Sequence, residues 1–405
     1  MNYLESNIWF PYFSCADEIY PIKVKSAKGV RLILEDGKEL VDAVSSWWAM
    51  CHGYSHPYII ERMKKQMDTL PHVMFGGVVH DASIELSTKL IKFLEAQELS
   101  KIFYSDSGST AVEVAIKMAI QYFYETGKSG KNKIIYFEEG YHGETLGALS
   151  FSHSMHSLFP SLSNKVLLKI PETEEEFAKL ESFLKQNHNE IAGAIIEPLM
   201  QGAGGMKFFS SEVIKKLWLL CTKYNILNIA DECATGFYRL GSKFAFHEIG
   251  LEPDILILGK ALTGGHVPLA LTIAKEFIFE GICKKSRFFH GPTFMANPIC
   301  LSSAIASIEL FEKEDYSLKV QKIEQIFKQE FAGFNAKIKG AVCAFDISKD
   351  LNLKVKKAVS LGKTNSFLRP FGTTLYTTPP LIINEADLKI IISDIKLCLH
   401  KNFAY

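Results

Sequence analysis

Along the middle of the chain, short apolar runs alternate with longer segments in which apolar residues recur at helical spacing. This alternation predicts an α/β fold whose sheet is largely parallel. The expected strands are Lys101–Tyr104, Lys133–Phe137, Ala192–Ile196, Ile226–Ala230 and Ile255–Leu258. The expected helices between them are Thr110–Thr126, Glu174–Asn187 and Ser211–Tyr224.

The pattern changes after Asn297. The elements expected there are helices over Leu301–Glu314 and Leu318–Phe334, a strand over Gly340–Ile347, and a last helix that begins at Glu385. At 405 residues, the chain exceeds the size at which a single hydrophobic core stops growing. We therefore expect a large domain over residues 46–297 and a smaller α+β domain formed by both chain ends, residues 1–45 and 298–405.

Composition narrows the class of protein without naming a reaction. Hydrophobic residues make up 47% and charged residues 22%, and the formal net charge is zero, as in ordinary soluble globular proteins. The scattered lysines and arginines give no nucleic-acid or membrane-binding footprint, and the longest apolar runs are only strand-sized. The segment Met1–Glu5 lacks a basic region followed by an apolar stretch, and no two of the eight cysteines form a C-x-x-C pair. These features predict a cytoplasmic enzyme with reduced thiols.

Two ionisable residues directly follow expected strands. The run Ile226–Ala230 is followed by Asp231, and the run Ile255–Leu258 is followed by Gly259 and Lys260. Ligands of open parallel sheets bind outside the carboxyl ends of the strands, and the spacing leaves room for one crossover back to the same edge. We therefore expect the carboxylate of Asp231 and the amine of Lys260 to face one crevice.

The glycines around Lys260 sharpen this interpretation. Taken alone, an acid and a lysine at strand ends are most often part of the solvated rim of a sheet. The segment Gly259–Gly265 (GKALTGG), however, lets the backbone approach a bulky planar ligand closely. A lysine in such a place can bond covalently to a carbonyl group of that ligand.

A third feature is the segment Asp106–Thr110 (DSGST), which follows an expected strand and opens an expected helix. A plain Ser/Thr N-cap is the commoner role of such a sequence. The N–H groups and hydroxyls at a helix start also bind phosphate. A phosphate site, a carboxylate that keeps a pyridine nitrogen protonated, and a reactive lysine are the three parts that pyridoxal phosphate (PLP) requires.

Five motifs occur in a specific order: Asp106–Ser109 (DSGS), Tyr141–Glu144 (YHGE), Glu197-Pro198, Ala230–Phe237 (ADECATGF) and Leu258–Gly265 (LGKALTGG). With them, the chain resembles the class III aminotransferases of fold type I over nearly its whole length. The resemblance implies a PLP-binding large domain with a mostly parallel sheet, a smaller α+β domain from both chain ends, and a homodimer with shared active sites.

A second set of motifs comprises Trp9–Tyr12 (WFPY), Ser45–Trp48 (SSWW), His52–Tyr54 (HGY), Met74–Gly77 (MFGG), His290–Met295 (HGPTFM) and Arg369–Gly372 (RPFG). Within the class, these resemble the members that convert 8-amino-7-oxononanoate to 7,8-diaminononanoate in biotin synthesis. Most such enzymes take the amino group from S-adenosylmethionine and some relatives take it from lysine. The residues here do not separate the two donors.

The resemblance also assigns roles toward the cofactor. Lys260 would hold PLP and move the proton between substrate and cofactor, and Asp231 would pair with the pyridine nitrogen. The other expected contacts are Gly108 and Ser109 at the phosphate, Tyr141 stacked on the ring, Glu197 beside Asp231, and Pro292 and Thr293 reaching the site of the partner subunit.

For the substrate, the resemblance implies a pocket lined by Tyr12, Trp47, Gly291 and Tyr376, with Arg369 at the carboxylate of the keto acid. Aromatic side chains and one arginine suit a long apolar chain that ends in a carboxylate. The alternatives are a core aromatic pair for Trp47 and Trp48, and a surface ion pair for Arg369. The spacing of His52, His142 and His290 fits no zinc pattern, so no metal is expected.

Two residues depart from the family pattern. Phe10 stands where the family usually has histidine, and Tyr238 replaces a small residue before Arg239; both bear on the amino donor. Two other functions stay open: a class III aminotransferase with an ornithine-like or gamma-amino substrate, and a PLP-binding regulatory protein that has lost catalysis. The Trp47-Trp48 pair argues against the first, and the intact set of Lys260, Asp231 and Ser109 argues against the second.

Overall fold

The computed structural model describes residues 7–17, 19, 21–152, 159 and 164–400. Its contacts divide the chain into two compact units. We call Pro57–Ser317 the central unit, and Met1–His56 together with Leu318–Tyr405 the end unit. These boundaries lie further along the chain than the expected ones at 45/46 and 297/298, and the expected domain bounds stay a prediction.

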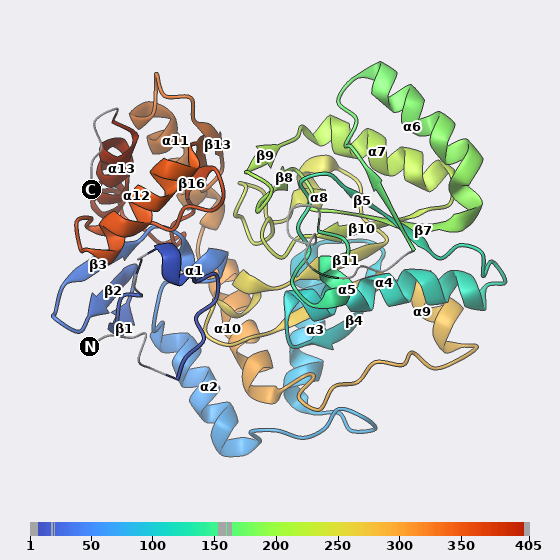
Figure 1. Cartoon of the computed structure of the whole chain (residues 1–405). Helices are drawn as coiled ribbons and strands as arrows, with labels where there is room; N and C mark the ends of the chain where they lie inside the picture. The colour runs from blue at the N-terminus through green and yellow to red at the C-terminus, as the bar shows by residue number, and fades with distance from the viewer. Residues whose placement is uncertain (1–6, 18, 20, 153–158, 160–163, 401–405) are drawn as a thin grey trace. The chain divides into compact units, whose positions relative to one another are not determined.

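The central unit contains a seven-stranded sheet (Figure 1). Its strands, in spatial order, are β4 (Leu99–Ser105), β12 (Ala270–Lys275), β11 (Ile255–Leu258), β10 (Leu227–Asp231), β7 (Ile191–Ile196), β5 (Lys133–Phe137) and β6 (Lys165–Leu168). Strand β12 pairs antiparallel with both β11 and β4, and the other pairings are parallel. The predicted α/β fold with a mostly parallel sheet is confirmed.

Helices cover this sheet because their apolar positions recur every three to four residues. Helix α4 (Gly108–Glu125) packs its buried face, including Ala111 and Ala115, against Ile195, Ile229 and Ile257 of the sheet. The other helices of the central unit are α2 (Pro57–Thr69), α3 (Asp81–Leu94), α5 (Leu146–Leu149), α6 (Glu174–Asn187), α7 (Ser211–Lys223), α8 (Ala245–Ile249), α9 (Glu276–Cys283) and α10 (Pro298–Lys313). The short strands β8 (Met200–Gln201) and β9 (Lys207–Phe208) form a separate hairpin.

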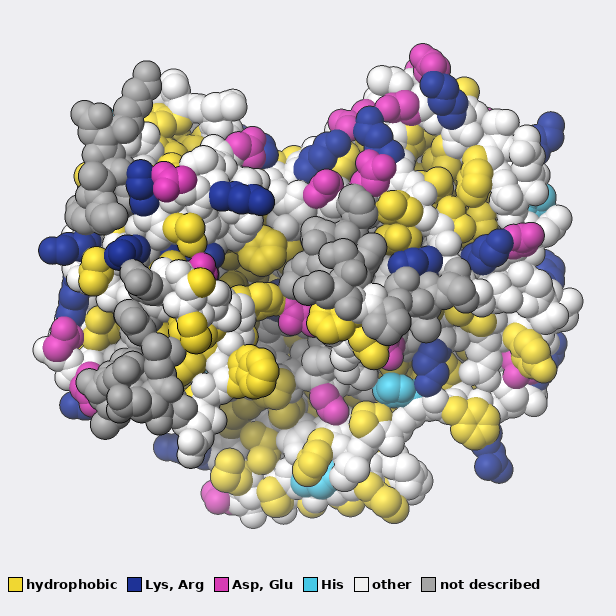
Figure 2. Space-filling view, in the orientation of Figure 1, with side chains coloured by type: hydrophobic (Ala, Val, Ile, Leu, Met, Phe, Trp, Pro, Cys, Tyr) yellow, Lys and Arg dark blue, Asp and Glu magenta, His cyan; other side chains and the backbone are white. Residues whose placement is uncertain are grey.

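Helices α6 and α7 lie side by side in Figure 1 and show how the outer surface is solvated. Figure 2 shows acidic and basic side chains interleaved over this region. Two ion pairs join α6 and α7, Lys216–Glu174 and Lys223–Glu181, each at 2.5 Å. Exposed pairs of this kind contribute little stability, so the packing of the buried faces holds these helices in place.

The end unit is built from both ends of the chain. One sheet has the order β1 (Val24–Lys28), β2 (Arg31–Leu34), β3 (Glu39–Asp42) and β15 (Ser366–Phe367), and β15 runs parallel to β3. A second sheet contains β13 (Lys337–Lys339), β14 (Val342–Asp346) and β16 (Thr374–Thr377). The helical elements are η2 (Cys15–Asp17), α1 (Ser45–Trp48), α11 (Tyr316–Glu330, which begins at the end of the central unit), α12 (Lys349–Ser360) and α13 (Glu385–Leu399).

Two general features of the structure bear on the class of protein. No helix among the described residues is long and apolar enough to cross a membrane. All eight cysteines lie in the described part of the chain and are free thiols.

Candidate active site

Four neighbouring strands of the central sheet bring predicted site residues to one edge. Strand β10 ends at Asp231, and Glu197 and Lys260 lie just beyond β7 and β11. Tyr141 follows β5 after a short loop. Because β11, β10, β7 and β5 are adjacent and parallel, their carboxyl ends meet at this edge. The expected convergence of Asp231 and Lys260 therefore follows from the strand order.

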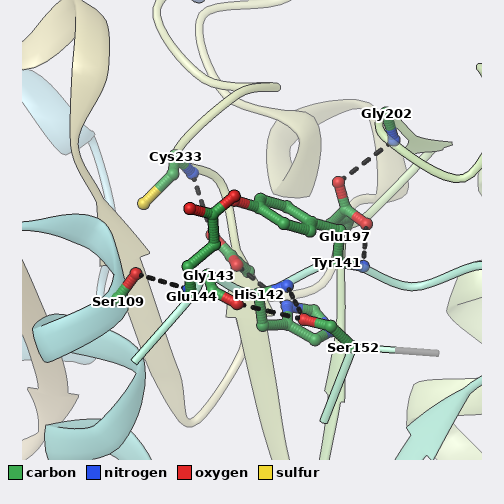
Figure 3. A network of polar contacts seen from close by, with 10 residues as sticks. Ser109, Tyr141, His142, Gly143, Glu144, Ser152, Glu197, Gly202 and Cys233 are labelled. Atoms are coloured by element: carbon green, nitrogen blue, oxygen red, sulfur yellow. Dashed lines mark hydrogen bonds and ion pairs between the residues drawn. The ribbon is translucent and has the colours of Figure 1, made fainter. Parts of the chain in front are cut away.

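Asp231 is a buried carboxylate that accepts two hydrogen bonds. Its Oδ2 lies 2.9 Å from Nδ1 of His142, and its Oδ1 accepts from the backbone N–H of Cys233 at 3.1 Å (Figure 3). Burial alone raises the pKa of Asp231, but the hydrogen bond and charge of His142 and the charge of Lys260 outweigh it and lower the pKa. Asp231 is therefore held in its ionised form.

Glu197 is a second buried acid in the same network. Its two oxygens accept from the backbone N–H groups of Tyr141 at 2.9 Å and Gly202 at 3.1 Å (Figure 3). Burial raises the pKa of Glu197 to about 7, with a further contribution from the negative charge of Asp231, and His142 acts in the opposite direction. Glu197 thereby fixes the backbone that carries Tyr141 and His142.

The N-terminus of α4 contacts this network through Ser109. Ser107 is the N-cap and accepts from the N–H of Thr110 at 3.3 Å, whereas the first-turn N–H groups of Gly108 and Ser109 have no acceptor within the helix. The hydroxyl of Ser109 accepts from the N–H of Glu144 at 3.0 Å. Gly143 has a φ of +121°, and a Cβ there would lie 2.2 Å from Oγ of Ser109, so only glycine allows this close approach.

Lys260 is held in an unusual backbone conformation, with a φ of 44°. It opens the 3-10 helix η5 (Lys260–Thr263), which is packed against α10. Two buried serines of α10 donate to this segment: Ser303 to the carbonyl of Thr263 at 2.9 Å, and Ser307 to that of Ala261 at 3.1 Å. A non-glycine residue with positive φ persists only where its surroundings impose it, so α10 fixes the position of Lys260.

These residues fit a PLP cofactor. The ionised carboxylate of Asp231 suits a protonated pyridine nitrogen, the start of α4 suits a phosphate, and Lys260 approaches from the adjacent strand. Tyr141 belongs to the same network: its hydroxyl donates to Glu144 at 3.1 Å, and burial raises its pKa to about 12. The contacts assigned to the cofactor remain predictions for each residue.

The predicted loop Gly291–Thr293 lies on the surface of the central unit. Gly291 and Thr293 are exposed, and Pro292 is half-buried and accepts from the N–H of Met295 at 3.1 Å. No hydrogen bond of the Thr293 side chain to a described residue is present. This exposure suits the expected role toward a partner subunit.

The predicted substrate residues Tyr12, Trp47, Arg369 and Tyr376 belong to the end unit. Tyr12 contacts Trp47 edge to face at 5.9 Å between ring centroids, and Trp48 stacks on Tyr376 at 6.1 Å. Trp47 is 45% exposed and Trp48 only 6%. The tryptophan pair is thus divided: Trp48 is a core residue, and Trp47 presents its ring at the surface of the unit.

The two tryptophans lie on a left-handed turn. Ser45, Ser46, Trp47 and Trp48 have φ values of 49°, 44°, 58° and 78°. This conformation costs roughly 1–2 kcal/mol per L-residue, so other contacts must hold it. Asp42 provides them: its buried carboxylate accepts from the N–H groups of Val44 and Ser46, both at 2.9 Å, and from the hydroxyl of Tyr54 at 2.6 Å.

Arg369 lines a cavity of the end unit together with Tyr12. It forms no hydrogen bond or ion pair with any described residue, so the alternative of a surface ion pair is not supported within the described chain. Burial lowers the pKa of Arg369, and the nearby Tyr376 opposes this shift.

The sequence did not predict the contact of His142 with Asp231, because His142 was considered there only as a possible metal ligand. The Tyr141–Glu144 motif was the available signal, but the partner Asp231 lies 89 residues further along the chain. Tyr238, a departure from the family, packs on Phe311 at 5.8 Å and on Tyr316 at 6.2 Å. No group of three or more histidines, cysteines or acids among the described residues is arranged to hold a metal ion.

Comparison with known proteins identifies the family. A family model described as aminotransferase class-III matches residues 12–399. The chain belongs to the class III aminotransferases. It is therefore an aminotransferase of the PLP-dependent kind, and the predicted class, fold type and cofactor are confirmed.

Two similar curated proteins carry the same name. The chain is 37% identical to adenosylmethionine-8-amino-7-oxononanoate aminotransferase of Buchnera aphidicola subsp. Schizaphis graminum, over 97% of this chain and 95% of the relative. It is 36% identical to the protein of that name from Synechococcus elongatus, over 96% and 97%.

Solved structures agree. The protein of the same name from Methanocaldococcus jannaschii superposes with a TM-score of 0.92 at 30% identity, covering 98% of this chain and 97% of that one. The omega transaminase of Pseudomonas jessenii in complex with PMP, the amino form of the cofactor, has a TM-score of 0.87 at 27% identity, covering 97% and 95%.

Proposed function

We propose that this aminotransferase converts 8-amino-7-oxononanoate to 7,8-diaminononanoate in biotin synthesis, with S-adenosylmethionine as the amino donor. The relatives named above support this substrate over nearly the full length of the chain. The structural observation that carries the proposal is the environment of Arg369. This residue forms no hydrogen bond or ion pair with any described residue, and it lines a cavity with apolar walls. That environment suits a long aliphatic acid better than the charged side chain of an ornithine-like substrate.

Each predicted site residue of the central unit has a separate role in the reaction. Bound PLP supplies the carbonyl group and the electron-withdrawing ring that carry the amino group from donor to acceptor. The amine of Lys260 takes up and returns the proton at the reacting carbon of the substrate. Asp231, kept ionised by His142, accepts a hydrogen bond from the ring nitrogen, and the amides of Gly108 and Ser109 hold the phosphate.

In the end unit, Arg369 binds the carboxylate of the keto acid, and Tyr12, which lines the same cavity, contacts its apolar chain. The other two expected substrate residues, Trp47 and Tyr376, are not among the residues that line this cavity. The intact Lys260, Asp231 and Ser109 argue against a regulatory protein that has lost catalysis. The cytoplasmic location stays a prediction.

The enzyme would act as a homodimer whose active sites include Gly291, Pro292 and Thr293 of the partner. Large hydrophobic side chains are exposed near this loop, in the last turn of α2 and after α2: Met67, Met74, Val79, Phe289 and Phe294. His72 and Phe294 lie 4.7 Å apart between ring centroids, which joins the two segments into one surface. Figure 2 shows hydrophobic side chains along the lower edge, where this surface lies. Exposed apolar patches of this kind mark protein–protein interfaces. Analytical ultracentrifugation of the PLP-loaded protein tests the dimer, and a mass of twice that of the chain would support it.

The deciding experiment incubates PLP-loaded enzyme with 8-amino-7-oxononanoate and either S-adenosylmethionine or lysine, and detects 7,8-diaminononanoate by mass spectrometry. Product with S-adenosylmethionine supports the proposal, whereas product with lysine alone supports the proposed keto substrate and contradicts the proposed donor. Absence of product in both, while the cofactor's absorbance still responds to other amines, would leave an aminotransferase with a different substrate.

A further inference from the structure

The cavity that contains Arg369 has a volume of about 500 Å³ and lies within the end unit. Much of its surface is apolar, with Phe10, Phe13, Ile22 and Leu368 among the lining residues. Helix α12 contributes Lys356, Val359 and Ser360, which share one helical face because they are three and four residues apart. A second cation, Lys356, therefore lines the same cavity as Arg369.

Neither cation has a close anionic partner in the part of the chain that the structure describes. Lys356 and Arg369 form no hydrogen bond or ion pair with any residue that the structure describes. Among the described residues that line the cavity, the acid is Asp17, which attracts Lys356 electrostatically without reaching ion-pair distance. Both cations are partly withdrawn from water, and each is therefore solvated less well than on an open surface.

Two like charges that share a partly buried cavity disfavour each other. Burial lowers the pKa of Lys356, and the charge of Arg369 lowers it further, while Asp17 acts in the opposite direction. An anion bound between them would offset both the desolvation and the repulsion. The apolar lining requires the rest of that ligand to be hydrocarbon, and the volume accommodates a chain of several carbons.

We propose that Lys356 is a specificity residue that binds the substrate's terminal carboxylate together with Arg369. The inference rests on the proposed function, because it places an aliphatic keto acid in this cavity. The planar guanidinium of Arg369 suits two parallel hydrogen bonds to one carboxylate, and the ammonium of Lys356 adds a point charge on a flexible stem. Phe10 and Phe13 contact the aliphatic chain of the ligand.

The test compares Lys356→Met with a matched control, Lys357→Met. Lys357 is the next residue of α12 and is not among the cavity-lining residues. Each variant is assayed with 8-amino-7-oxononanoate and with its methyl ester, which has the same chain without the negative charge. We expect Lys356→Met to raise KM for the acid about tenfold, the usual effect of losing a charged hydrogen bond, with kcat and the KM for the ester unchanged.

Lys356→Arg, which keeps the charge, should restore the KM for the acid to within about twofold of the wild-type value. Equal KM values of Lys356→Met and Lys357→Met for the acid would overturn the proposal. Equal losses with the acid and the ester would also overturn it, since they would assign Lys356 to the packing of α12.

A direct binding measurement separates this proposal from the proposed function. If the wild-type enzyme does not turn over 8-amino-7-oxononanoate, the proposed function fails, and the cavity is then tested by calorimetric titration of PLP-loaded enzyme with nonanoate. Nonanoate binding that is weakened in Lys356→Met and kept in Lys357→Met supports the carboxylate site. Absent binding, or equal binding to the two variants, refutes it.

Discussion

The charged residues of the candidate site are arranged in opposite ways in the central and end units. In the central unit, Asp231 and Glu197 each accept two hydrogen bonds from the protein. In the end unit, Arg369 and Lys356 line a cavity and make no hydrogen bond or ion pair within the described chain. In the central unit, the protein fixes the positions of the charges before any ligand binds, as electrostatic catalysis requires. In the end unit, the ligand completes the interactions of the cations, so these cations determine which substrate binds.

The sharpest test of the central unit is Lys260→Ala. We expect kcat to fall by at least about 10⁴-fold, because no other amine occupies this position at the end of β11. Borohydride reduction followed by peptide mass spectrometry should find the cofactor's mass on Lys260 in the wild type and on no lysine in the variant. A cofactor adduct on another lysine, with turnover preserved, would contradict the assignment.

Asp231→Asn should have the next largest effect, lowering kcat by roughly 10²- to 10³-fold. The change keeps the shape of the side chain and removes the charge that His142 stabilises. Asp254→Asn is the matched control, because Asp254 is a mostly buried acid just before β11, at the opposite edge of the sheet, where it pairs with Lys275 at 3.3 Å. The control should alter stability and leave kcat unchanged; equal kcat values in the two variants would show that Asp231 is not the cofactor's partner.

The end unit should respond more weakly and mainly in substrate affinity. Asp42→Asn weakens the contacts that hold the left-handed turn, so we expect KM for the keto acid to rise about threefold and the free energy of unfolding to fall by about 1–3 kcal/mol. Near-ultraviolet circular dichroism should change as well, because the turn carries two of the four tryptophans. Asp36→Asn, at an exposed turn of the same unit, is the control; a spectrum of Asp42→Asn identical to that of the control would mean that other contacts hold the turn.

The last effect is on stability and concerns pH and Glu197. Its pKa rises from 4.5 in the unfolded chain to about 7 in the folded protein, so the folded state binds the proton more tightly. The stabilisation is therefore complete below pH 4.5 and is lost as pH rises toward 7, by up to about 1.4 kcal/mol per pH unit from this group. Glu197→Gln should flatten the fall in unfolding free energy between pH 5 and pH 7, measured by urea titration, whereas equal slopes in variant and wild type would contradict this pKa.

Local pattern predicted much of the central unit. Strand β5, helix α6 and strand β11 have the bounds expected from the sequence, since each has a clear apolar pattern and is bounded by polar or turn-forming residues. Ser107 caps α4 as its position suggested. The convergence of Asp231 and Lys260 was predictable for the same reason: two buried strands joined by one crossover must end at the same edge.

Features that depend on distant partners were not predictable from one sequence. Strand β12 was not among the expected strands, and its antiparallel direction depends on pairing with β4 and β11. His142 gains its role only from Asp231, and the left-handed conformation of Ser45–Trp48 contradicts the local preference of all four residues. Lys356 was missed because nothing in the pattern of α12 distinguishes it from the neighbouring lysines of that helix.

The construction of the end unit from both chain ends sets an order of events during synthesis. The central unit is contiguous, so all of its residues have been made once Ser317 is added. Two contacts of the β3–α1 region need residues that are made much later. The parallel neighbour of β3 is β15, which ends at Phe367, and the hydroxyl of Ser45 donates to the carbonyl of Thr378. During synthesis, β3 can pair with β2 at once, whereas its pairing with β15 and the hydrogen bond from Ser45 to Thr378 form only after those distant residues are made. The segment that carries Trp47 and Trp48 therefore stays exposed to chaperones until then.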